Sequence, residues 1–193
     1  GHPWCKYWVH IHHLNTNHGK MSKSSGEFLT VSLLEEKGYD PLVYRFFCLQ
    51  SHYRKGLVFS WENLDNARAA YDKLIARVAA LDPADGPVDQ EAAAAWKDKF
   101  VEAVGNDLNT SLGITALYDV LKADLNGATK LAVLDSFDQV LGLDLLKKAA
   151  ALREQQAAPA EGAEEIEALI AKRLEAKRAK DWAAADAIRD QLK

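Results

Sequence analysis

Two lysines lie in a short segment whose other residues are too small and polar to build a core. Residues 17–26 read NHGKMSKSSG and include Lys20 and Lys23. Gly19 and Gly26 flank the lysines and permit backbone angles that other residues avoid. Two cations among small residues suit a transient polyanion such as a triphosphate. A solvated basic turn is the alternative, because a KxxK spacing by itself is common.

Histidines close to this segment raise the question of a metal site. The candidates are His10, His12, His13 and His18, together with Cys5. Their spacing fits no closed tetrahedral set, so we expect structural roles for them and no metal ligand in this chain. Cys48 stands among phenylalanines and leucine, and we expect it to be a buried apolar residue.

Composition and charge exclude several classes of protein. The 193 residues are 48% hydrophobic and carry a net charge of -4, so any RNA contact must come from local basic patches. Two cysteines without a CxxC pair fit the reducing cytoplasm. No apolar run reaches membrane-spanning length, so we expect no membrane partner. The first residue is Gly1, and the helical pattern continues to Lys193 without a stop signal. We therefore expect a fragment of a longer protein.

The elements that position the lysines begin with an expected strand over residues 7–14, which are rich in β-formers. A loop over residues 15–26 follows. Thr30 is expected to cap a short helix, and Asp40 is expected to cap a second one. Residues 51–60 combine turn residues with a short extended piece.

The chain from residue 60 onward is expected to be helical. Four amphipathic segments with short connections predict an antiparallel bundle. Their apolar stripes are Leu64, Ala67, Tyr71, Leu74, Val78 and Leu81; Trp96, Phe100, Val101 and Val104; Leu112, Leu117, Val120 and Leu121; and Leu131, Leu134, Phe137 and Leu141. Residues 153–165 have no apolar period and predict a flexible linker. Residues 166–193 predict two short helices that pack as a hairpin.

Several of these segments together resemble bacterial cysteinyl-tRNA synthetases. In chain order they are YWVH, GKMSKSSGEFLTV, GYDPLVYRFFCLQSHYRKGLVFSWENLDNAR, NDLNTSLGITALYDVL and AKDWAAADAIRDQL. The resemblance covers the chain from about Tyr7 to Lys193. KMSKS by itself is typical of every class I aminoacyl-tRNA synthetase. Its combination with HYRKGLVFSWENL and AKDWAAAD is specific to the cysteine enzyme.

The resemblance implies a ligase that activates cysteine with ATP and Mg²⁺ and transfers it to tRNA(Cys). In that family the HIGH-type motif and the zinc ligands, two Cys, one His and one Glu, lie upstream of the YWVH segment. This chain then corresponds to the C-terminal part and is expected to be inactive alone. The implied fold is mainly α: the end of the catalytic domain with the KMSKS loop and stem-contact region over 1–59, a DALR-type helical bundle over 60–152, the linker over 153–165, and an anticodon-recognition hairpin over 166–193.

The resemblance also assigns roles to residues of the lysine segment. Lys23 contacts the pyrophosphate that leaves in adenylate formation, and Lys20 supports it or orients the loop. The ATP-binding residues are then Lys20, Met21, Ser22, Lys23 and Ser24. Cations aimed at the departing oxygens stabilise the transition state, and a loop of small residues can close after ATP arrives.

Two further segments are candidates for tRNA contact. Arg54 and Lys55 lie where the resemblance places the inner corner of the tRNA, although a solvated basic turn is an equal reading. Residues 172–193 carry seven cations against four acidic residues, a local net charge of +3. Within them Trp182 can stack on a base or pack in a core, Asp186 can accept from a base, and Lys177 or Arg178 can hold a phosphate or a base edge.

Two other functions remain open at this stage. A stand-alone tRNA-binding module without catalysis would have the same fold. A related cysteine ligase that acts on an amino sugar shares the KMSKS half but needs no anticodon reader, so AKDWAAADAIRDQL argues against it. The expected partners are tRNA(Cys), cysteine and ATP, and a monomer is expected.

Overall fold

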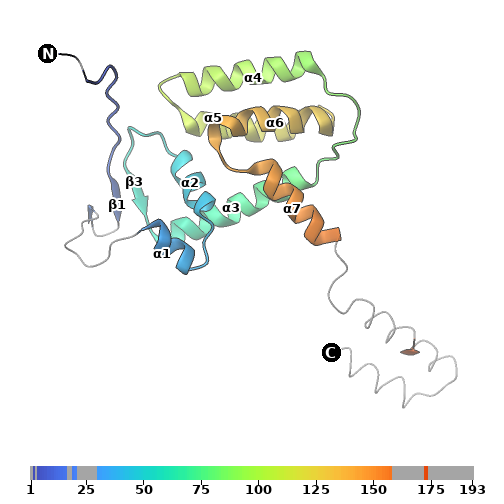
Figure 1. Ribbon diagram of the computed structural model, residues 1–193, viewed down its shortest axis with the longest axis horizontal. Helices are drawn as coiled ribbons and strands as arrows, with labels where there is room; N and C mark the ends of the chain where they lie inside the picture. Colours follow the sequence, from blue (N-terminus) through green and yellow to red (C-terminus); the bar gives the residue numbers. More distant parts are fainter. Residues whose placement is uncertain (1, 3, 17–18, 21–29, 158–171, 174–193) are drawn as a thin grey trace. The chain divides into compact units, whose positions relative to one another are not determined.

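The computed structural model describes residues 2, 4–16, 19–20, 30–157 and 172–173 (Figure 1). The chain forms two compact units, Gly1–Leu152 and Arg153–Lys193. The described part is mainly helical with a small sheet. Its elements are β1 Leu14–Thr16, β2 Gly19–Lys20, α1 Val31–Glu36, α2 Pro41–Leu49, β3 Leu57–Phe59, α3 Trp61–Ala79, α4 Gln90–Gly105, α5 Thr110–Lys122, α6 Gly127–Leu141 and α7 Leu145–Ala157.

The sheet is shorter than the sequence predicts and begins later. Strand order is β2-β1-β3, with β1 antiparallel to β2 and parallel to β3. The strand predicted over residues 7–14 is wrong, because only Leu14 of that range is in a strand. The loop predicted over 15–26 is also wrong at its start, since β1 continues to Thr16 and pairs with β2. Residues 7–13 have β-forming side chains, but in the described part of the chain their backbone has no partner strand.

The predicted caps of the first two helices are confirmed. The Thr30 hydroxyl accepts a hydrogen bond from the N–H of Leu33 at 3.1 Å, which starts α1. The Asp40 carboxylate accepts from the N–H of Leu42 at 2.8 Å, and Pro41 occupies the first position of α2. Between the helices Gly38 has a φ of +77°, a conformation in which glycine carries no penalty.

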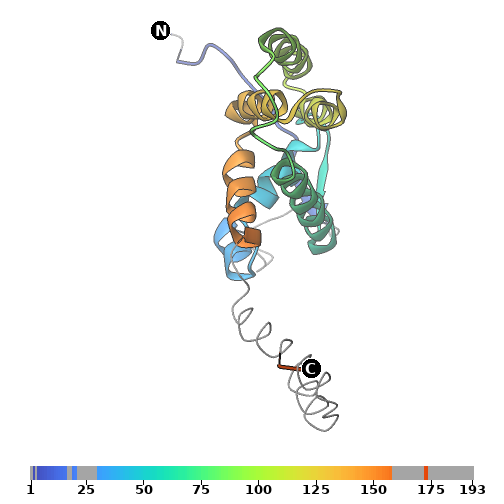
Figure 2. The ribbon, with the colours of Figure 1, turned by 90° about the vertical axis from the view of Figure 1, so that its right-hand side faces the viewer.

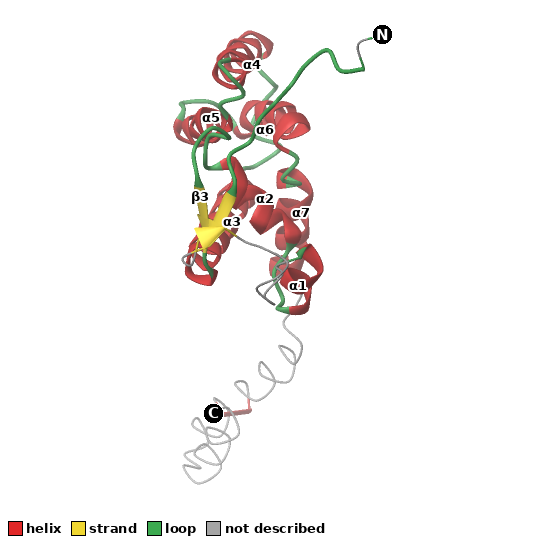
Figure 3. Ribbon diagram, turned by 90° about the vertical axis from the view of Figure 1, so that its left-hand side faces the viewer, coloured by secondary structure: helices red, strands yellow, loops and turns green. Residues whose placement is uncertain are grey.

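The four long helices after residue 60 do not form the predicted four-helix bundle. Helices α4, α5 and α6 pack on one another, whereas α3 packs mainly against α2 (Figures 1 and 2). The reason is the apolar face of α2, whose Phe46 ring lies 5.7 Å from that of Tyr71 on α3. The small sheet lies beside α2 and α3 (Figure 3).

The residues of the predicted apolar stripes are buried or half-buried, with two exceptions. Phe100 of α4 and Phe137 of α6 are fully buried and stack with ring centroids 4.1 Å apart. Val101 and Leu112 were predicted to be in the core, but they are 56% and 43% exposed. Neither belongs to the buried residues of its helix, which are Phe100 on α4 and Gly113, Ile114, Leu117 and Val120 on α5.

Helix α7 was not predicted from the sequence. Its fully buried residues are Leu145 and Ala149. Because alanine is small, this buried face differs little in hydrophobicity from the rest of the helix, and the sequence pattern does not reveal it. The helix continues to Ala157, so the beginning of the predicted 153–165 linker is helical. Of the two helices predicted within 166–193, only Lys172 and Arg173 belong to the described residues, and both are helical.

Candidate functional site

The loop over residues 51–56 connects α2 to β3 and carries the two predicted RNA-contacting cations. The N–H of Lys55 donates to the carbonyl oxygen of His52 at 2.9 Å, which closes a tight turn. The N–H of His12 donates to the carbonyl oxygen of Tyr53 at 2.9 Å. The loop is therefore fixed both within itself and by the segment that precedes β1.

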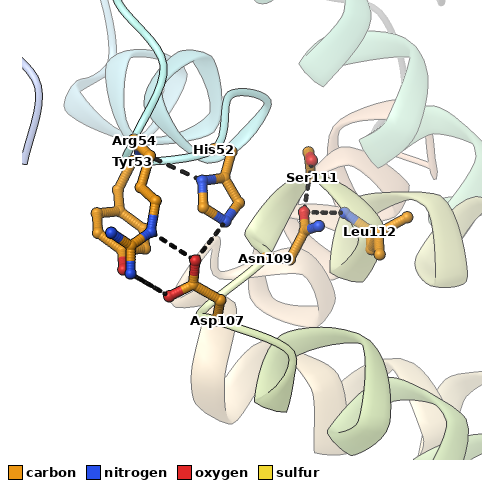
Figure 4. A network of polar contacts seen from close by, with 7 residues as sticks. All are labelled: His52, Tyr53, Arg54, Asp107, Asn109, Ser111 and Leu112. Carbon is orange, nitrogen blue, oxygen red and sulfur yellow. Dashed lines mark hydrogen bonds and ion pairs between the residues drawn. The ribbon is translucent and has the colours of Figure 1, made fainter.

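The carboxylate of Asp107 binds three side chains of this loop (Figure 4). Arg54 donates from Nε to Oδ2 at 2.6 Å and from Nη2 to Oδ1 at 2.9 Å, which makes a bidentate ion pair. The hydroxyl of Tyr53 donates to Oδ1 at 2.6 Å. Nε2 of His52 lies 3.7 Å from Oδ2. We call these four residues the Asp107 network.

Hydrogen bonds set the charge state of this network. The bonds from Arg54, and then from Tyr53, hold the pKa of Asp107 well below its ordinary value. The same bond to Asp107 raises the pKa of the Tyr53 hydroxyl, which keeps it protonated as a donor. At neutral pH Asp107 is therefore an anion that offsets the charge of Arg54.

Asp107 comes from a turn that joins α4 to α5. Asp107 and Leu108 have φ values of +58° and +53°, in the left-handed region that non-glycine residues seldom adopt. Asn109 then caps α5, because its side chain accepts from the N–H of Leu112 at 3.2 Å. The hydroxyl of Thr110 donates to the carbonyl oxygen of Leu49 at 2.9 Å, which ties the turn to the end of α2.

Aromatic stacking orders the loop further. The rings of His52 and Tyr53 stack with centroids 4.9 Å apart, and the guanidinium carbon of Arg54 lies 5.0 Å from the Tyr53 ring centroid. Lys55 follows directly and is exposed. Its ammonium group forms no ion pair within the part of the chain that the structure describes.

A cavity of about 400 Å³ lies beside this loop. Its lining is mostly apolar and includes Ile11, Leu14, Tyr44, Cys48, Leu49 and Leu57. Burial raises the pKa of the Cys48 thiol. Burial, and to a smaller extent the nearby Cys48, raises the pKa of the Tyr44 hydroxyl to about 12. Both groups are neutral at physiological pH, so the cavity presents no activated nucleophile from them.

The other predicted site residues lie largely outside the described part of the chain. Lys20 forms the end of β2, where it pairs with Asn15 of β1. The rest of the predicted ATP loop and of the predicted anticodon-recognition set falls outside the described residues: Met21, Ser22, Lys23, Ser24, Lys177, Arg178, Trp182 and Asp186.

The described residues form neither a metal-binding cluster nor a membrane-spanning helix. No three His, Cys, Asp or Glu side chains in this part of the chain come together to hold a metal ion. Among the described helices, none is both long and apolar enough to cross a membrane.

Sequence reasoning did not single out Asp107. It read the NDLNT segment only as part of the resemblance and as the start of a helix. An Asp before the Asn cap is a weak signal, because Asp tolerates the left-handed region better than most residues. The partner loop, 53 residues earlier in the chain, cannot be inferred from that signal.

Comparisons with known proteins confirm the resemblance to aminoacyl-tRNA synthetases that are specific for cysteine. The family described as "tRNA synthetases class I (C) catalytic domain" matches residues 1–69. The chain is 41% identical to cysteine–tRNA ligase 1 of Burkholderia lata, over 97% of this chain and 38% of the relative. It is 40% identical to the cysteine–tRNA ligases of Novosphingobium aromaticivorans and Escherichia coli, over 97% and 98% of this chain and 39% and 42% of those relatives. The chain thus spans about two fifths of the length of these curated relatives.

Proposed function

We propose that this chain is the part of a cysteine–tRNA ligase that carries the KMSKS loop and the tRNA-binding regions. The observation that carries the proposal is the alignment of nearly the whole chain with proteins named cysteine–tRNA ligase at about 40% identity. The same matches favour a ligase over a stand-alone RNA-binding module or an amino-sugar ligase. In the complete enzyme cysteine and ATP give an adenylate, and the cysteinyl group then passes to tRNA(Cys).

The chemistry proposed for this chain is stabilisation of the leaving pyrophosphate. Lys23 contacts it, and Lys20 supports or orients the loop, with Met21, Ser22 and Ser24 completing the ATP-binding segment. One well-placed donor contributes about 3–4 kcal/mol to such a transition state. The Mg²⁺ that accompanies ATP is part of the substrate. Zinc and the HIGH-type motif of the family belong to residues outside this chain.

The proposal also divides the chain by role. Residues 1–59 end the catalytic domain and contact the tRNA stem, and residues 60–152 form the DALR-type tRNA-binding domain. The 51–56 loop, with Arg54 and Lys55, faces the tRNA backbone. Residues 166–193 read the anticodon. We propose a cytoplasmic monomer.

A fusion tests the proposal. The chain is joined behind the N-terminal part of the Burkholderia lata ligase that it does not align with, and cysteine-dependent ATP–pyrophosphate exchange and tRNA(Cys) aminoacylation are measured. We expect the fusion to be active and the chain alone to be inactive. In the fusion, Lys23→Ala should lower exchange by about 100- to 1000-fold. Lys97→Ala, which removes an exposed lysine of α4, is the matched control and should leave it unchanged. Exchange by the chain alone, or an unaffected Lys23→Ala fusion, would contradict the proposal.

Trp182 provides a separate test of the anticodon assignment. The fusion carrying Trp182→Ala is compared with the unaltered fusion on tRNA(Cys) and on a transcript with a changed anticodon. We expect the variant to lose discrimination, because a stacked aromatic ring typically contributes about 1–3 kcal/mol per base. Unchanged discrimination would assign Trp182 to packing alone.

A further inference from the structure

The turn between α4 and α5 holds the predicted RNA-contacting loop at two points. The carboxylate of Asp107 accepts from two nitrogens of Arg54 and from the hydroxyl of Tyr53. The hydroxyl of Thr110 binds the carbonyl oxygen of Leu49, immediately before the loop. The backbone of the turn adopts left-handed angles at Asp107 and Leu108, which direct the carboxylate toward the loop. These hydrogen bonds restrain the 51–56 segment and the residue at the end of α2 that leads into it.

Arg54 forms an ion pair with Asp107 within the folded chain. Nε and Nη2 form one of the two guanidinium edges that can bind a phosphate with two parallel hydrogen bonds, and both atoms donate to Asp107. Its guanidinium also lies against the Tyr53 ring. A bidentate contact of that edge with RNA would require the Asp107 pair to open first.

Lys55 is differently placed. Its main chain is held by the turn to His52, while its side chain is exposed and forms no ion pair within the described part of the chain. An ammonium group offers three donors and needs no planar partner, so it can meet a single phosphate oxygen. The loop thus carries Arg54, which is paired with Asp107, next to Lys55, which forms no ion pair among the described residues.

Resting on the proposed function, we propose that Asp107 is a positioning residue for tRNA binding. It holds Arg54 and Tyr53 so that the loop presents Lys55 to a phosphate of the tRNA backbone. Lys55 makes the RNA contact, and Arg54 acts through the loop. A competing role for Asp107 is to mask a phosphate-binding Arg54, and the two roles predict opposite effects of neutralising the carboxylate.

The first experiment separates phosphate contact from positioning through salt dependence. Binding of a fluorescent tRNA(Cys) transcript to the 193-residue chain is measured between about 50 and 200 mM salt. Lys55→Ala should reduce the slope of log affinity against log salt by about 0.7–0.9, the value of one lost phosphate contact. Arg54→Ala should weaken binding without changing the slope. Lys97→Ala, which removes an exposed lysine of α4 outside the 51–56 loop, is the comparison variant, and it should lower the slope less than Lys55→Ala does.

The second experiment neutralises the carboxylate. Asp107→Asn and Asp107→Gly both suit a φ of +58°, so the turn keeps its backbone. Each should weaken tRNA binding by about 3- to 10-fold at every salt concentration, because the loop must then be ordered on binding. Asp98→Asn, an exposed aspartate of α4, is the control for the loss of one negative charge and should not weaken binding. Urea unfolding verifies that each variant is folded.

A double variant then tests whether Asp107 acts through Arg54. The combined effect of Arg54→Ala and Asp107→Asn should be clearly smaller than the product of the single effects, because both remove the same interaction. Fully multiplicative effects would overturn the inference, as would tighter binding and a steeper slope for Asp107→Asn or an unchanged slope for Lys55→Ala. If the unaltered chain binds no tRNA, the proposed function itself fails, and that result is distinct from these.

Discussion

Gly127 stands where helix α6 begins against the chain that leaves α3. A Cβ atom added at this residue would lie 2.2 Å from the carbonyl oxygen of Asp82 and 3.0 Å from the carbonyl carbon and nitrogen of that residue. All three neighbours are backbone atoms, which cannot rotate away. The N–H of Gly127 also donates to the carboxylate of Asp85 at 2.9 Å. Gly127→Ala must therefore separate α6 from the 82–85 segment.

The size of the effect follows from this geometry. An ordinary contact needs more than 3.4 Å, so the two segments must move apart by over 1 Å. Forcing extra volume into a packed site costs about 1–3 kcal/mol, and a rigid neighbour places Gly127→Ala toward the upper end. Alanine recovers less than about 1 kcal/mol in helix propensity. We expect a net loss near 2 kcal/mol, or a melting temperature lower by about 4–8 °C.

Gly105→Ala is the matched control for this prediction. Gly105 is the last residue of α4, has no atom within 4 Å of an added Cβ, and should be neutral or stabilised by up to about 1 kcal/mol. Both variants of the 193-residue chain are unfolded in urea and by heat, with helical circular dichroism as the signal. A Gly127→Ala chain as stable as the unaltered one would refute the close approach of α6 to Asp82.

Three further predictions concern buried and charged partners. Tyr71→Phe removes the buried hydrogen bond of 2.6 Å from the Tyr71 hydroxyl to the carbonyl oxygen of Leu143. The free energy of unfolding, measured in urea, should fall by about 1–3 kcal/mol. A smaller fall would mean that water replaces the donor. Asp138→Ala leaves the N–H groups of Leu143, just before α7, and of Leu145, its first residue, without their carboxylate acceptor, with an expected loss of about 1–3 kcal/mol; unchanged stability would contradict these two hydrogen bonds. The third concerns Asp107, whose pKa is lower in the folded chain than in the unfolded chain, so its contribution is present above the ordinary carboxyl pKa and declines as the pH falls below it. Asp107→Asn should thus lose less stability than the unaltered chain between about pH 5 and pH 2, and parallel pH profiles would contradict the Arg54 pairing.

Local chemistry made the helix starts predictable. Thr30 and Asp40 each accept a hydrogen bond from an N–H of the first turn, as their side chains and the apolar pattern after them predict. A cap depends on neighbours within three residues, so the sequence contains the whole interaction. The same holds for the buried stripes of α3 and α6.

Non-local pairing was beyond the sequence. Residues 7–13 have the side chains of a strand, but a strand requires a partner, and within the described ranges β3 pairs with residues 14–16. Helix α3 packs mainly against α2. The sequence did not predict this pairing, because an apolar stripe identifies the buried face of a helix without identifying the element that covers it. The pairing of Arg54 with Asp107 depends on a left-handed turn and on the packing of α2 against α5. The basic loop was found from the sequence, and its acidic partner was not.

The separation of Arg54 and Asp107 along the chain has a consequence for synthesis. Asp107 leaves the ribosome 53 residues after Arg54, a delay of about 3–10 seconds at typical elongation rates. During that interval the guanidinium has no carboxylate from the α4–α5 turn, and the nascent loop can meet cellular polyanions as a bare basic segment. The loop can pair with Asp107 only after α4 and the turn that follows it have been synthesised. Slow translation through α4 would therefore prolong the time during which Arg54 is unpaired.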